Sequence, residues 1–148
     1  MMIAATVRML PMYKDLTLES HNPEEEILMK FMMVVKASKD SEAGTMPKEQ
    51  MDQMFAEMKK YNEELKNAGV LVSVGGLHPS SNGIRITYPI PGEPPTITEG
   101  PFAEVNELIA GYWFIDVKSR EEAIKWAMRA PDPHGLGEGQ IELRQVFE

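Results

Sequence analysis

The chain has 148 residues, the length of one ordinary domain with a single core. Its formal net charge of −8 argues against binding to nucleic acid or to an anionic membrane surface, because both require a basic face. The sequence has no cysteine, which excludes disulfides, thiolate zinc sites and a cysteine nucleophile. We therefore expect a cytoplasmic globular protein that makes no direct contact with nucleic acid or membrane.

Residues 1–28 differ from the rest of the chain. Their apolar run is interrupted by Arg8 and Pro11, so it is too short and too broken to span a membrane. No basic stretch precedes the run, as it would in a signal peptide. We expect residues 1–28 to be an N-terminal extension, either an appended tail or the product of an upstream start codon. The folded domain is then residues 29–148.

The first half of this domain predicts a strand, a polar loop and a long helix. Residues 30–36 are a compact apolar run typical of a buried strand, and residues 38–44 are polar and predict a loop. A helix follows Pro47 and ends before Gly69. Its apolar positions recur at helical spacing at Met51, Met54, Phe55, Met58, Tyr61 and Leu65.

Two more strands are predicted at residues 70–74 and 84–88, and Asn82-Gly83 between them indicates that they pair as a hairpin. Residues 89–95 contain four prolines and predict an extended connector. Residues 110–117 predict the strongest strand, with Trp113 on the face opposite Tyr112 and Phe114.

The C-terminal part predicts one more helix and one more strand. Ser119 and Glu122 have the spacing of a capping box, which begins the helix, and Pro131 ends it. Residues 140–147 alternate apolar and polar side chains as a last strand.

This order of elements predicts an α+β fold of ferredoxin-like plan, an antiparallel sheet with two helices on one face. The other face is left bare and carries Tyr112 and Phe114 beside Arg144. We expect a second copy of the chain to cover it, which makes the protein a homodimer.

Residues 98–107 read Thr-Glu-Gly-Pro-Phe-Ala-Glu-Val-Asn-Glu, a rigid acidic turn that carries one aromatic side chain. The run resembles the Asp-Gly-Pro-Phe-Ala-Glu-Thr-Lys-Glu signature of the YCII-related (DGPF) domain family. The resemblance implies a dimeric α+β barrel with a cleft associated with each subunit. Most members of the family have no established activity.

A second run, Gly76-Leu77-His78-Pro79-Ser80-Ser81, is similar to one found in a subgroup of that family. His78 is a candidate general acid or base because histidine titrates near neutral pH. Ser80 or Ser81 would orient His78 or a ligand. The alternative is that His78 caps the hairpin by bonding to the backbone.

The acidic turn and the strands supply further candidates. Phe102 would form a wall of the cleft, and Glu99 beside it would be a proton acceptor or, alternatively, a cap for exposed backbone amides. The strand-borne cations Arg85, Arg144 and Lys36 would hold a small anionic ligand if they converge. The alternative is that they form cross-strand pairs with acidic residues such as Glu142.

The three histidines, His21, His78 and His134, lack metal-ligand spacing, so we expect neither a metal nor a cofactor. His134 falls in the loop at residues 131–135, which we expect to be mobile. Relatives of the resembled family include a dehydrochlorinase thought to use a His-Asp dyad, with the histidine on the first helix. Residues 50–57 of this helix hold no histidine, so that activity is not carried over.

These observations predict a homodimeric small-ligand-binding protein with acid/base chemistry of lyase or isomerase type. His78 would be the acid or base, and Arg85 or Arg144 would hold an anion. The alternative is a non-enzymatic accessory or regulatory protein that acts through protein contacts, as the resemblance implies for members associated with transcription initiation.

Overall fold

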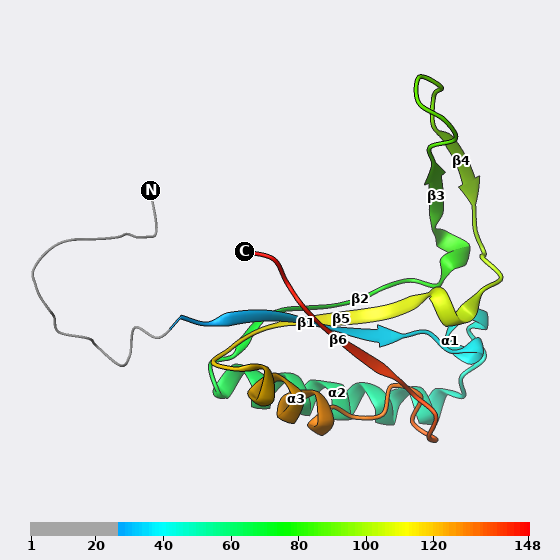
Figure 1. Ribbon diagram of the computed structural model, residues 1–148. Coiled ribbons are helices and arrows are strands. Elements are labelled where there is room, and N and C mark those ends of the chain that lie inside the picture. The colour runs from blue at the N-terminus through cyan, green and yellow to red at the C-terminus, as the bar shows by residue number, and fades with distance from the viewer. Residues whose placement is uncertain (1–26) are drawn as a thin grey trace, which may run out of the picture.

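The computed structural model describes residues 27–148 (Figure 1). Residues 1–26, most of the expected N-terminal extension, lie outside the described residues. The domain is built on a four-stranded antiparallel sheet with the strand order β2-β5-β1-β6. These strands are β1 (Met29–Lys36), β2 (Leu71–Gly76), β5 (Ile109–Val117) and β6 (Ile141–Gln145).

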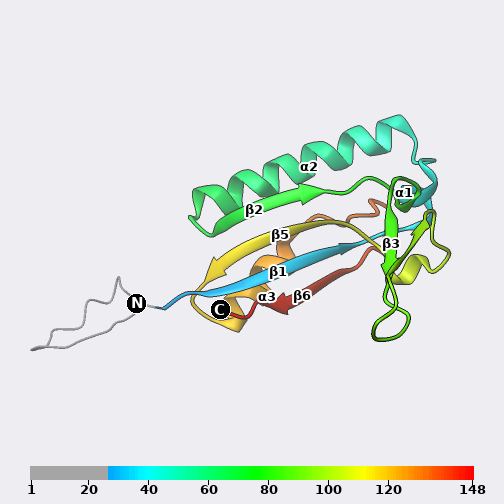
Figure 2. The same ribbon diagram turned by 90° about the horizontal axis from the view of Figure 1, so that it is seen from above.

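Two long helices, α2 (Lys48–Asn67) and α3 (Arg120–Arg129), cover one face of this sheet (Figures 1 and 2). Helix α2 connects β1 to β2, which have β5 between them, and α3 connects β5 to β6, which have β1 between them. This topology is consistent with the predicted ferredoxin-like plan, so the α+β expectation is confirmed. Within residues 27–148, every helix is too short or too polar to cross a membrane.

The core lies between the sheet and the two helices. Alternate side chains of the central strands point into it, namely Phe31, Met33 and Val35 of β1 and Trp113, Ile115 and Val117 of β5. The ring of Tyr61 packs edge-on against that of Trp113, with centroids 5.2 Å apart. The Tyr61 hydroxyl donates to the carbonyl of Trp126, and burial raises the pKa of Tyr61.

The expectation of a loop over residues 38–44 is wrong, because a short helix, α1 (Lys39–Ala43), forms there. The Ser38 hydroxyl accepts a hydrogen bond from the Ser41 amide, and the Ser41 hydroxyl accepts one from the Ser38 amide. This reciprocal cap gives the amides of Ser38 and Ser41 hydrogen-bond partners at the start of the helix. Gly44 ends the helix with a left-handed φ of 69°.

The cap of α3 is formed only in part as expected. The Ser119 hydroxyl accepts from the Glu122 amide at 3.1 Å, as in a capping box. The Glu122 carboxylate, however, accepts from the amide of Lys118 at 2.8 Å. The carboxylate thus reaches one residue further back along the chain than the predicted pattern requires.

The expected hairpin between β2 and the next strand is also wrong. Strand β3 (Ile84–Thr87) pairs with β4 (Thr96–Glu99), and the proline-rich residues 89–95 form the loop between them. Asn82 belongs to a 3₁₀ turn, η3 (Ser80–Asn82), which takes the chain away from the main sheet. The physical reason is that β2 pairs instead with β5, which lies much later in the sequence.

The β3–β4 hairpin, here called the arm, rises from the sheet on the side opposite the helices (Figure 1). Every residue of its two strands is exposed. The large apolar side chains that it leaves uncovered are Ile84, Ile86, Tyr88, Ile90 and Ile97. A two-stranded hairpin with no apolar cover is marginally stable in water.

The face of the sheet opposite the helices, here called the open face, is partly apolar. Tyr112 and Phe114 of β5 contact each other edge-on, with ring centroids 5.6 Å apart. Met32 of β1 stands in register between Phe114 and Arg144. The face also carries an ion pair between Lys30 and Asp116 with an N–O distance of 2.9 Å, and this hydrogen bond raises the pKa of Lys30.

Candidate functional site

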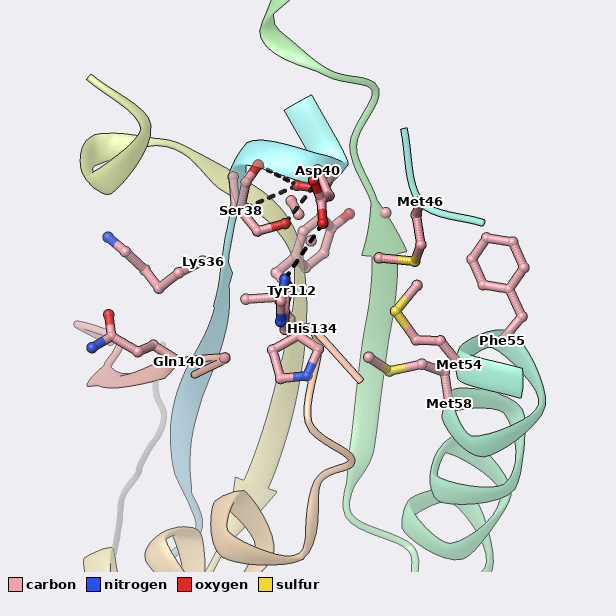
Figure 3. A pocket seen from close by; sticks show the side chains of 18 of the residues that line it. Lys36, Ser38, Asp40, Met46, Met54, Phe55, Met58, Tyr112, His134 and Gln140 are labelled. Carbon is pink, nitrogen blue, oxygen red and sulfur yellow. Dashed lines mark hydrogen bonds and ion pairs between the residues drawn. The ribbon is translucent and has the colours of Figure 1, made fainter. Parts of the chain in front are cut away.

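A pocket of about 810 Å³ lies where β1 ends and β5 begins. Helices α1 and α2, the end of β2 and the loop before β6 surround it. Figure 3 shows that its lining is divided: polar side chains, including Asp40 and His134, lie on one side, and methionines on the other. Its size is in the range of cavities that bind small organic molecules.

His134 and Asp40 face each other on the polar side of the pocket. Nδ1 of His134 lies 2.8 Å from the carbonyl oxygen of Gly137, and because a carbonyl only accepts, Nδ1 must be the donor. The other nitrogen, Nε2, faces the Asp40 carboxylate at 3.8 Å (Figure 3). In the neutral ring Nε2 therefore carries the lone pair, which makes it the basic atom of the site.

The loop that carries His134 is held by Asp132. The Asp132 carboxylate accepts hydrogen bonds from the amides of His134 at 2.9 Å and Gly137 at 2.6 Å. Burial opposes ionisation of this carboxyl, yet the backbone hydrogen bonds and the charge of His134 outweigh it and hold the pKa of Asp132 below its usual range. The side chain of Gln50 on α2 also donates to the carbonyl of His134 at 2.9 Å. His134 is thus fixed both by its own loop and by α2.

We expect Asp132→Asn to lower the free energy of unfolding by about 1 kcal/mol at neutral pH, because the amide weakens two charge-assisted hydrogen bonds. The pKa of Asp132 is lower in the folded than in the unfolded protein, so its contribution is fully present above the unfolded value of about 3.9. The contribution is lost as pH falls through the folded pKa. Urea unfolding at a series of pH values should therefore show the difference from wild type shrink in acid.

The control for this variant is Glu93→Gln, on the exposed loop of the arm. It removes a carboxylate without touching the His134 loop and should leave stability within about 0.5 kcal/mol of wild type. A difference between wild type and Asp132→Asn that stays constant down to the lowest pH would contradict the assigned role of the carboxylate.

The opposite side of the pocket is apolar. It is lined from α2 and the turn before it by Met46, Met54, Phe55 and Met58 (Figure 3). Methionine side chains are flexible and polarisable, so such a wall adapts to apolar bodies of different shape.

Tyr112 lies against Gly75, where a Cβ atom would be 2.6 Å from the tyrosine hydroxyl oxygen. A glycine at this position therefore makes room for the Tyr112 ring.

Three of the residues predicted for the site come together outside this pocket. The Ser80 hydroxyl donates to the Glu42 carboxylate of α1 and accepts from the Phe102 amide at 3.0 Å. The Arg85 guanidinium stacks on the Phe102 ring, 3.9 Å from its centroid. This group joins α1, the arm and the turn at Gly100 into one packed unit.

The other predicted residues are dispersed. His78 and Glu99 are exposed and lie outside the pocket, and the Ser81 hydroxyl donates to the side chain of Asn82 at 3.3 Å. Arg144 forms an ion pair with Glu142 at 3.0 Å on β6, whereas Arg85 belongs to the arm. The two arginines are thus in different sheets. Of the three strand-borne cations, Lys36 lines the pocket.

Sequence reasoning missed both members of the His134–Asp40 pair. It assigned His134 to a mobile loop and passed over Asp40. One signal was available, because an aspartate two residues before the histidine and five before Gly137 can bond both amides and order the loop. Nothing in the spacing of Asp40 and His134 indicates that they meet. In the described part of the chain, no three acidic or histidine side chains converge as a metal site.

The match to one family model agrees with the resemblance carried by the acidic turn. A search of curated proteins found no match. The family model of the YCII-related domain matches residues 29–148, which is the whole of the folded domain predicted from the sequence. The chain therefore belongs to the YCII-related domain family.

Proposed function

We propose that the protein binds a small organic ligand in the pocket and exchanges a proton with it through His134. The observation that carries this proposal is the His134–Asp40 pair, in which one ring nitrogen is fixed as a donor and the other faces the carboxylate across 3.8 Å. The pocket of about 810 Å³ beside the pair provides the volume that a ligand needs.

The chemistry of the pair suits proton transfer to and from a ligand. Neutral His134 accepts a proton at Nε2, and the Asp40 carboxylate stabilises the imidazolium that results. The imidazolium then returns the proton to another atom of the ligand. This sequence is the acid/base part of a lyase or isomerase reaction, and it assigns to His134 the role that the sequence analysis gave to His78.

The proposal includes a homodimer in which a second copy covers the open face of the sheet. It is supported by the half-buried aromatic pair of Tyr112 and Phe114 on the open face and by the exposed apolar arm on the same side. Apolar side chains that the domain leaves in contact with water are candidates for an interaction surface. Closing the open face in this way would give the dimeric α+β barrel that the family resemblance implies.

The test compares His134→Ala with His78→Ala in thermal unfolding against a panel of small acids, alcohols and ketones. A compound at one hundred times its dissociation constant stabilises its protein by about 2.7 kcal/mol. We expect this stabilisation to vanish in His134→Ala and to persist in His78→Ala. The reverse pattern would return the site to His78, and loss in neither variant would place the ligand elsewhere.

A second candidate function, accessory action through protein contacts, is favoured by the arm. Its five exposed large apolar side chains belong to a segment that adds nothing to the core. Replacing Ile86 and Ile97 with serine tests this candidate, because it removes apolar surface from the arm and leaves the pocket intact. If ligand binding and dimer formation both survive the double substitution, the arm is free to serve another protein.

A further inference from the structure

We infer that the ligand of this pocket is a neutral molecule with an apolar body and a hydroxyl group, and that the hydroxyl binds between His134 and Asp40. The inference rests on the proposed function and adds the chemical class of the ligand. It follows from two observations: the hydrogen-bonding character of the two facing groups and the division of the pocket lining into a polar and an apolar side.

A hydroxyl can bind between the facing groups in both protonation states of His134. The Asp40 carboxylate only accepts, and Nε2 of the neutral ring also only accepts, because Nδ1 holds the proton for Gly137. A ligand hydroxyl can donate its one proton to Nε2 of the neutral ring, and Asp40 then keeps the hydrogen bond that it accepts from the Thr45 hydroxyl. When the ring is protonated, Nε2–H donates to the hydroxyl oxygen and the hydroxyl donates to Asp40.

The separation of the pair leaves a place for that oxygen. Nε2 and Oδ2 of Asp40 are 3.8 Å apart, which is beyond a direct hydrogen bond. An oxygen set beside the pair lies within about 2.8 Å of both atoms, in the usual range for such bonds. A carboxylate there would face Asp40 with like charge, and an ether oxygen would have no proton to donate to it.

The rest of the lining favours a neutral apolar body. Met46, Met54 and Met58 form a continuous wall opposite the pair (Figure 3). The charged residues around the pocket balance, with Lys36 and Lys39 against Asp40 and Glu138. No net field therefore selects a charged ligand, and burial against the thioethers supplies the main binding energy.

The experiment uses three probes that share one apolar body: 4-tert-butylcyclohexanol, its methyl ether and the corresponding carboxylate. Affinities for the full chain are measured by ligand-observed NMR titration. We expect the wild type to bind the alcohol at least about fivefold more tightly than it binds the ether. A difference of this size is expected for one hydrogen bond. The preference should disappear in His134→Ala.

Two further variants separate the parts of the inference. Met54→Gln keeps the side-chain length and makes the wall polar, so it should weaken binding of the alcohol severalfold. Met128→Gln is the matched control, because Met128 is 81% exposed on α3 and lies outside the pocket. Asp40→Asn removes the charge that rejects the carboxylate probe and should strengthen its binding.

The outcomes distinguish the ligand class from the proposed function. Preference of the wild type for the carboxylate, with loss of binding in His134→Ala, would overturn the class and leave the function standing. The inferred ligand class would also be wrong, and the proposed function would stand, if none of the three probes binds while another compound stabilises the wild type and not His134→Ala. If His134→Ala changes the binding of none of the three probes and of no compound in the thermal-unfolding panel, the inferred ligand class and the proposed function are both wrong.

Discussion

Gly100→Ala is expected to lower the free energy of unfolding by about 3 kcal/mol or more, which places it among the most damaging single substitutions. A Cβ atom on Gly100 would lie well inside contact distance of the Ser80 carbonyl oxygen. That oxygen belongs to the backbone, so no side chain can move aside to relieve the overlap. The amide of Gly100 also donates to the carbonyl of Gly83 at 2.9 Å, and this bond would be lost if the turn shifted.

Gly83→Ala provides the matched control for this prediction. A Cβ atom there would lie 3.4 Å from the same Ser80 oxygen, an ordinary contact, and φ of Gly83 is −102°. We expect this variant to lose less than about 1 kcal/mol. Urea unfolding of both variants measures the difference directly, and equal losses would show that the close approach at Gly100 is not what limits the turn.

The Phe114→Lys variant is expected to be monomeric at concentrations where the wild type forms the proposed dimer. Phe114 lies on the open face, so the substitution leaves the core unchanged. In the dimer its ammonium group would be buried without a partner, at a cost of about 3 kcal/mol, which weakens association more than a hundredfold. Sedimentation equilibrium over a range of protein concentrations gives the two association constants.

Met128→Lys serves as the control, since it adds the same charge to an exposed apolar residue on α3, on the helical side of the sheet. It should associate like the wild type. A wild type that stays monomeric, or a Phe114→Lys variant that associates equally well, would show that a second copy does not cover this face.

The elements that were correctly predicted are those that can be identified from their own residues, without knowing which strand or helix they pack against. Helix α2 carries its apolar stripe in its own sequence, and β1 and β5 are apolar runs that any buried strand would show. The pairing of β3 was mispredicted because Asn82-Gly83 indicates only that the chain turns. Which strand lies across the turn depends on β5, which occupies the place beside β2.

The candidate site was harder to predict than the strands and helices, because its residues come from segments far apart in the sequence. The acidic turn was recognised from residues 98–107, but its hydrogen bond to Ser80 joins segments that sequence patterns treat separately. Asp40 and His134 are further apart still, on α1 and on the loop before β6. Their meeting depends on the order of strands in the sheet, which no local pattern encodes.

The position of His134 just before β6 links the site to the edge of the sheet. Strand β6 pairs with one neighbour, β1, and an edge strand of this kind opens more readily than the central strands. When β6 detaches, the loop that carries His134 loses its attachment to the sheet and is held by Asp132 and by Gln50 of α2. A bound ligand that contacts His134 would therefore slow amide hydrogen exchange in β6 although no residue of β6 lines the pocket, so this edge of the sheet would report on occupancy of the pocket.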